Sequence, residues 1–154
     1  MKTMKKLAAA FFVFALLAGV QLYSASASEF DKQSTIVANG QTLTAFPYEI
    51  NKTTLVPARA VSDALGFKID WNQTAQTATI TGDAMQMTVK VGQDSYMATS
   101  TIAIGTTAPA ELGAAPLLIN DSLYVPAEIF RIIQGNDPQA VQQLDHQIII
   151  NKVK

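Results

Sequence analysis

Residues 54–72 read TLVPARAVSDALGFKIDWN, and this stretch decides the fold. A β-prone run over 53–56 leads into Pro57, which suits the first turn of a helix because no backbone N–H is needed there. Apolar residues then recur at helical spacing and predict a short helix over 58–65. Gly66 fits the position just past the helix end, where a left-handed backbone is favoured. The stretch therefore predicts a strand, a helix and a turn in direct succession.

Further strands are predicted on both sides of this helix. Asn39-Gly40 separates two β-prone runs, and this dipeptide is the strongest short signal for a hairpin because both turn positions need a positive φ. Elsewhere, apolar and polar residues alternate with the period of half-buried strands, or a short apolar run indicates a buried one. The predicted strands are 34–38, 41–46, 67–71, 77–81, 85–91, 122–126 and 147–151.

The pattern of residues 50–66 recurs over residues 119–135 without a gap. The identical positions are Ile50, Asn51, Val56, Pro57, Ala58 and Gly66 in the first copy, and Ile119, Asn120, Val125, Pro126, Ala127 and Gly135 in the second. The second copy predicts another short helix over 127–134. Two copies are too few for a solenoid, which needs about three or more. We expect one α+β domain of mostly antiparallel strands, with two short helices packed on one face.

Residues 1–27 have the pattern of a secretory signal peptide. Lysines precede an apolar run over 7–20, and Ala25-Ser26-Ala27 forms a small-x-small cleavage site. An uncleaved membrane anchor is the alternative, but the apolar run is short for a membrane span. We expect residues 28–154 to form a single secreted domain, free in the extracellular space or associated with the cell wall. Its pseudo-repeat halves would be about 34–92 and 103–154.

The composition excludes several classes of function. With no cysteine and one histidine, the chain cannot form disulfides, thiolate metal sites or sites built from several imidazoles. A net charge of −1 argues against nucleic-acid binding. His146 beside Asp145 is expected to be a surface histidine at a turn, and no Gly-x-Ser-x-Gly motif accompanies it. We therefore expect no enzyme activity, cofactor or metal, although a hydrolase using scattered carboxylates remains an alternative.

The stretch 97–120 carries a single charge, on Glu111, and is rich in Thr, Ala, Gly and Pro. Ile102 and Ile104 are a short strand candidate within it. Long connections of this kind in a compact domain are often functional, so the loop 97–118 is a candidate partner-binding segment. Leu112 or Met97 would fill an apolar pocket of a protease. The candidate contact residues are Met97, Pro109, Glu111, Leu112 and Pro116.

The run 54–72 resembles the copper amine oxidase N-terminal-like domain, also called the stalk domain, of secreted Gram-positive bacterial proteins. The matching positions are Val56, Pro57, Arg59, Val61, Leu65, Gly66, Ile69, Trp71 and Asn72. The second copy keeps Val125, Pro126 and Gly135 but has Glu128 where the first has Arg59. The resemblance implies a strand-rich, non-catalytic accessory domain. It does not imply amine oxidation, because that chemistry needs a copper site of several histidines.

Several residues of the repeated pattern are expected to have structural roles: Val56, Pro57, Arg59, Gly66, Trp71, Val125, Pro126 and Gly135. Arg59 would fasten helix to sheet, or pair with Asp63 four residues later. Trp71 is expected in the core, although a carbohydrate-stacking surface shared with Tyr124 is an alternative.

The leading hypothesis is a secreted, non-catalytic binding module acting on an extracellular protein or the cell wall. The alternative is a secreted inhibitor of serine proteases that presents the 97–118 loop. A module that assembles with itself through an edge strand is a third possibility. The sequence leaves the oligomeric state open, and no membrane contact is expected after signal cleavage.

Overall fold

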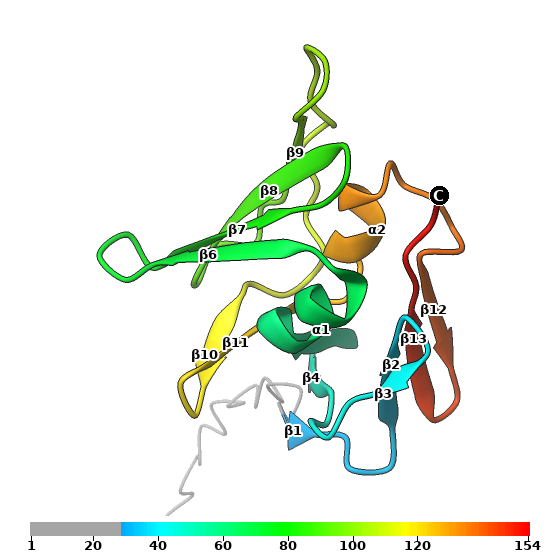
Figure 1. Cartoon of the computed structure of the whole chain (residues 1–154). Coiled ribbons are helices and arrows are strands. Elements are labelled where there is room, and N and C mark those ends of the chain that lie inside the picture. Colours follow the sequence, from blue (N-terminus) through cyan, green and yellow to red (C-terminus); the bar gives the residue numbers. More distant parts are fainter. Residues whose placement is uncertain (1–28) are drawn as a thin grey trace, which may run out of the picture.

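The computed structural model describes residues 29–154, so the predicted signal peptide lies outside the described residues. Within that range the strands form three small sheets (Figure 1). Sheet I has the order β1 (Glu29–Phe30), β4 (Tyr48–Ile50), β5 (Thr53–Pro57), β11 (Ser122–Pro126) and β10 (Leu117–Ile119). Sheet II has the order β12 (Val141–Leu144), β13 (Gln147–Ile150), β2 (Thr35–Ala38) and β3 (Gln41–Thr42). Sheet III has the order β6 (Lys68–Asn72), β7 (Thr77–Thr81), β8 (Met85–Lys90) and β9 (Ala98–Ser100).

The two Val-Pro strands of the sequence pattern lie side by side in sheet I. β5 and β11 run antiparallel, with Val56 opposite Val125, and both valines are fully buried. Each strand is entered from a hairpin, through Asn51-Lys52 in one case and Asn120-Asp121 in the other. All four of these turn residues have positive φ, between 47° and 65°. Two successive positive φ values match the twist of the flanking strands.

Helix α1 (Ala58–Leu65) has the predicted bounds. Gly66 follows it with a φ of 71°, and the N–H groups of Gly66 and Phe67 donate to the carbonyls of Asp63 and Ser62. α1 contacts β5 and β11 of sheet I, β2 of sheet II and β6 of sheet III. The helix therefore lies where the three sheets meet (Figure 1). This differs from the expectation of two helices on one face, because the strands divide into three sheets around α1.

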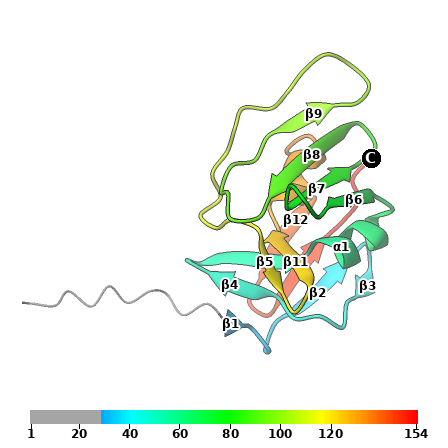
Figure 2. The ribbon, with the colours of Figure 1, turned by 90° about the vertical axis from the view of Figure 1, so that its left-hand side faces the viewer.

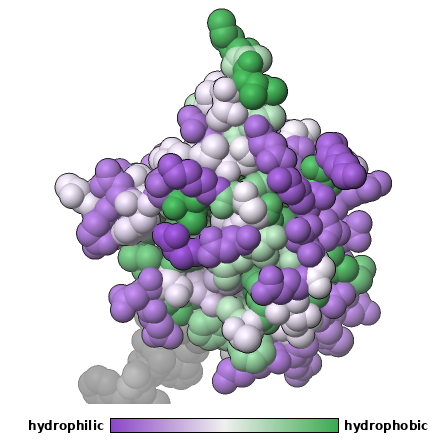
Figure 3. Space-filling model, in the orientation of Figure 1, coloured by the Kyte–Doolittle hydropathy of each residue, from purple (hydrophilic) through white to green (hydrophobic). Residues whose placement is uncertain are grey.

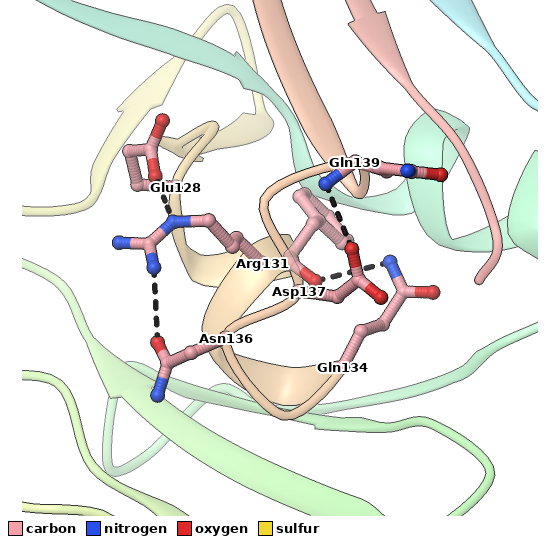
Figure 4. A network of polar contacts seen from close by, with 7 residues as sticks. Glu128, Arg131, Gln134, Asn136, Asp137 and Gln139 are labelled. Carbon is pink, nitrogen blue, oxygen red and sulfur yellow. Dashed lines mark hydrogen bonds and ion pairs between the residues drawn. The ribbon is translucent and has the colours of Figure 1, made fainter. Parts of the chain in front are cut away.

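Helix α2 (Ile129–Ile133) is shorter than the predicted range 127–134 and contacts β8. Polar side chains hold the turn that follows it (Figure 4). The Arg131 guanidinium donates to Glu128 Oε2 at 2.6 Å and to Asn136 Oδ1 at 3.2 Å. Gln134 Nε2 donates to the Phe130 carbonyl at 3.1 Å. These contacts take up polar groups at the end of a helix too short to be stable alone.

One main core connects the sheets and both helices, with Ile36, Ile80 and Phe130 among its fully buried side chains. A smaller, separate cluster consists of Leu55 and Tyr124 from sheet I together with Ala114. Phe30 packs edge-on against Tyr48 and Tyr124, with ring centroids 5.0 and 5.9 Å away. These contacts hold residues 29–30 as a short strand, which pairs with β4.

Sheet II contains the pairing that local sequence patterns do not predict. β13 is central, as its apolar run indicated, with β12 antiparallel on one side and β2 parallel on the other. β12 was not predicted. The predicted strand 41–46 is reduced to β3, because the chain bends after Thr42.

Candidate functional site

The connection from β9 to β10 rises above the body of the protein (Figure 2). We call residues 101–105 the tip, and residues 94–100 together with 106–116 the base. The two arms of the base run antiparallel, since Tyr96 and Ala110 exchange two backbone hydrogen bonds of 2.8 Å. Higher up, the Thr107 N–H donates to the Ala98 carbonyl at 2.8 Å, and the Ala98 N–H donates to Thr107 Oγ1 at 3.0 Å. The loop is thus an ordered ribbon rather than a free coil.

Asp94 clamps the descending arm of the base. Its carboxylate accepts the N–H of Leu112 at 2.8 Å and the N–H of Gly113 at 2.9 Å. On the other side, Thr53 Oγ1 donates to the Leu112 carbonyl at 2.8 Å and Asn51 Nδ2 donates to the Gly113 carbonyl at 3.3 Å. Hydrogen bonds to a charged acceptor are stronger than neutral ones. The clamp therefore fixes the loop to the β4–β5 hairpin of sheet I.

Tyr96 anchors the base in the core. Its side chain is fully buried, and its hydroxyl donates to the Ala114 carbonyl at 2.6 Å. Burial, reinforced by the negative charge of Asp94, raises the pKa of the Tyr96 phenol well above its ordinary value. The hydroxyl therefore stays neutral and keeps its proton to donate.

The tip has the opposite character. The side chain of Ile102 is 76% exposed and that of Ile104 is fully exposed. In the space-filling view, an apolar projection stands out at the top of the molecule (Figure 3). The bend itself is held by Ser100, whose N–H donates to the Gly105 carbonyl at 2.9 Å. Ser100 Oγ also accepts the N–H groups of Ile102 and Ala103, at 3.3 and 3.0 Å. The tip is a shaped turn that presents two isoleucines to solvent.

The five predicted contact residues differ in their exposure to solvent. Met97 is 44% exposed, and Pro109 and Glu111 are exposed along the arms. Leu112 is half-buried against the core and Pro116 is buried, so both side chains contribute to the packing of the base.

Ile102 and Ile104 were interpreted as a short strand, but the strand here is β9 and both isoleucines follow it. Two isoleucines in a stretch of Thr, Ala and Gly were the available signal for an exposed contact. Their alternation favoured the strand instead.

Most of the residues with expected structural roles are either buried in a strand or placed in a turn of positive φ. Val56, Pro57, Val125 and Pro126 are buried in β5 and β11. Gly66 and Gly135 have φ values of 71° and 73°, which favour glycine. Arg59 is exposed on α1, and within residues 29–154 it makes no ion pair with Asp63.

Trp71 is half-buried: it packs against the core and also borders a surface groove with Arg59 and Tyr124. Its expected core position is therefore only part of its environment.

Neither a cluster of metal-ligating side chains nor a membrane-spanning helix is found in the part of the chain that the structure describes. Among residues 29–154, no group of three or more His, Asp or Glu side chains could hold a metal ion. None of the helices in that range is long and apolar enough to cross a membrane. His146 is exposed in the turn between β12 and β13, where its carbonyl accepts the Thr35 N–H.

Comparisons with known proteins agree with the sequence pattern. The family model of the copper amine oxidase N-terminal domain matches residues 37–143. A protein of Brevibacillus choshinensis named "Protease inhibitor" is 33% identical over 120 residues, which are 76% of this chain and 34% of that protein. The chain thus spans about a third of the length of this curated relative. No solved structure matches it.

Proposed function

This chain belongs to the copper amine oxidase N-terminal domain family, and from that premise we propose that it is a secreted, non-catalytic module that inhibits an extracellular protease. The observation that carries the proposal is the apolar tip on its hydrogen-bonded base. The name of the Brevibacillus choshinensis relative supports a protease as partner. Secretion is supported by the signal-peptide pattern of residues 1–27.

The tip supplies binding energy through its two isoleucines. Transferring one fully exposed isoleucine into an apolar pocket contributes about 1.5–3 kcal/mol. The base lowers the cost of that transfer, because a loop already held in one conformation loses less entropy on binding. An apolar specificity pocket in a protease cleft has the shape and chemistry to receive such a side chain.

A binding role fits the rest of the molecule better than catalysis. Asp94, the carboxylate in the ascending arm of the base, is engaged by two backbone N–H groups. One histidine in the whole chain cannot supply the several imidazoles of an amine oxidase copper site. We therefore interpret the family match as that of a non-catalytic accessory domain.

We also infer that residues 50–66 and 119–135 are two copies of one unit. Both contain a hairpin turn with two positive φ values, a strand ending in a buried Val-Pro pair, and a helix followed by a glycine of positive φ. The likeness ends after the glycines, since β6 joins sheet III and β12 joins sheet II. The paired copies would form the rigid centre from which the loop projects.

The test is a protease panel with matched variants of the mature chain, residues 28–154. Serine proteases with apolar specificity pockets are compared with one that prefers basic side chains, and residual activity is titrated against inhibitor. The double variant Ile102→Ser/Ile104→Ser should inhibit at least about 100-fold less well, because roughly 1.4 kcal/mol is a factor of ten in affinity. Leu144→Ser is the control, since Leu144 is 58% exposed on β12, outside the loop.

Near-stoichiometric inhibition by the wild type and by Leu144→Ser, lost in the double variant, supports the proposal. Equal inhibition by the wild type, Leu144→Ser and the double variant would show that the tip does not contribute to inhibition. If no protease of the panel is inhibited, the inhibitor function is rejected and a binding module without that activity remains.

A further inference from the structure

A surface groove lies away from the tip. This groove of about 600 Å³ is bordered by β6, by the exposed side of α1 and by the β10–β11 hairpin. In Figure 1 these elements surround the left-hand side of the molecule, with β6 above and β10 below. Small-molecule sites in proteins are usually about 300–1,000 Å³. The groove shares no lining residue with the tip, so it can be tested separately.

Trp71 gives the groove an aromatic wall. The indole is packed against the core on β6 and borders the groove. Its Nε1–H donates to Gln73 Oε1 at 2.7 Å, which fixes the ring and satisfies its only donor. The wall therefore presents carbon and π surface instead of a free hydrogen-bonding group.

Unpaired polar side chains complete the lining. Arg59 and Asp63 come from α1, and Asp121 comes from the turn between β10 and β11. Within the described residues, none of these three side chains has a hydrogen-bond or ion-pair partner. The guanidinium offers five N–H donors and the two carboxylates offer only acceptors. The groove thus combines a fixed aromatic surface with unused donors and acceptors.

We propose that this groove binds an uncharged oligosaccharide. A pyranose ring has an apolar C–H face that can lie on the indole, and hydroxyls at its rim that both donate and accept. Hydroxyls can therefore pair with Arg59 and with the carboxylates of Asp63 and Asp121 at once. An apolar ligand would desolvate these charges without pairing them, which is costly. The net negative charge of the three groups disfavours an anionic polymer.

The chain contains one tryptophan, so its fluorescence reports on the groove directly. The mature chain, residues 28–154, is titrated with tetramers of β-1,4-linked glucose and of β-1,4-linked N-acetylglucosamine. At least one should produce a saturable change in Trp71 emission and protect the indole from acrylamide quenching. The double variant Arg59→Ala/Asp63→Asn should bind roughly tenfold or more weakly, the loss expected for about 1.4 kcal/mol.

Lys68→Ala is the matched control. Lys68 lies on β6, the strand that carries Trp71, but its side chain is exposed and pairs with Asp70 outside the groove. This variant should bind as the wild type does, and thermal unfolding of every variant should stay near that of the wild type. A charged uronic-acid tetramer and a short mixed peptide complete the panel.

Binding of a neutral tetramer that depends on Arg59 and Asp63 supports the proposal. The absence of a saturable signal with both neutral tetramers overturns it. So does preference for the uronic-acid tetramer or for the peptide, and so does equal binding by the groove variant and the wild type. Protease inhibition measured on the same groove variant should be unchanged, which separates this site from the tip.

Discussion

The base and the tip, which together span residues 94–116, belong to one continuous segment but use their residues in opposite ways. In the base, Asp94 and Tyr96 direct their polar groups at the protein's own backbone, and Tyr96 is fully buried. In the tip, Ile102 and Ile104 leave apolar surface in water. Scattered exposed apolar residues are ordinary, whereas these two isoleucines together on a projection are the basis of the proposed contact surface. The difference predicts that stability and binding can be changed separately.

The largest effect on stability is expected at the centre of the base. Tyr96→Ala removes a fully buried ring and should lower the free energy of unfolding by about 3–5 kcal/mol. Tyr96→Phe keeps the ring but leaves the Ala114 carbonyl without its donor, which should cost about 1–3 kcal/mol. Urea denaturation measures both values. A loss below about 1 kcal/mol in the alanine variant would mean that the base is not an integral part of the core.

The clamp should contribute less than the ring. Asp94→Ala leaves the N–H groups of Leu112 and Gly113 without their acceptor and should destabilise the protein by about 1–3 kcal/mol. Asp94→Asn retains one oxygen and should fall between the alanine variant and the wild type. Limited proteolysis then reports the state of the loop, with faster cleavage near residue 112 in the alanine variant. Equal cleavage in both chains would contradict the clamp.

Alkaline pH should loosen the base through the phenol. The folded pKa of Tyr96 is raised above the ordinary value of 10.0, mainly by burial, so the folded state favours the neutral form. The resulting stability is fully present below pH 10 and is lost as pH rises beyond it, because the unfolded chain releases this proton first. The free energy of unfolding, measured from pH 8 to pH 11.5, should fall less steeply in Tyr96→Phe. Identical slopes would argue against the assignment.

The smallest effect on stability is expected at the tip. Ile102→Ser and Ile104→Ser should each change the free energy of unfolding by no more than about 0.5 kcal/mol, because both side chains are largely exposed to solvent. The same variants should show the largest losses in protease inhibition. If a tip variant lost as much free energy of unfolding as Tyr96→Phe, the tip would be part of the same stabilising unit as the base. The proposed separation of stability from binding would then be wrong.

Local signals predicted the elements that are determined by neighbours in the sequence. Helix α1 has the predicted bounds, since Pro57 and Gly66 frame it, and Asn39-Gly40 forms the predicted hairpin turn. Strand β8 follows its period-2 alternation, with Met87 and Val89 buried. In these cases the residue types that favour a conformation also form its boundaries.

Elements that depend on distant partners were not predictable in this way. β12 reads as polar, VQQL, and is a strand because β13 pairs with it. Leu112 and Pro116 looked like loop residues but are covered by contacts that the fold brings to them.

Trp71 alternates in phase with Phe67, which is buried, yet β6 is the edge strand of sheet III and leaves the indole half exposed at the groove. The sequence indicated the loop as a candidate site. The assignment of its residues to base or tip required the three-dimensional structure.

The parallel pairing of β2 with β13 has a consequence for how the chain reaches its native state. Thr35 and His146 meet across 111 positions of sequence, so this sheet cannot close until nearly the whole domain has been synthesised. Contacts between such distant residues slow folding, because the chain entropy must be lost before the contact is gained. Until β13 arrives, β2 presents an open edge that another unfolded chain can occupy. Pairing of residues 147–150 with β2 therefore closes the sheet. The rate of this pairing sets the time during which newly made chains can aggregate.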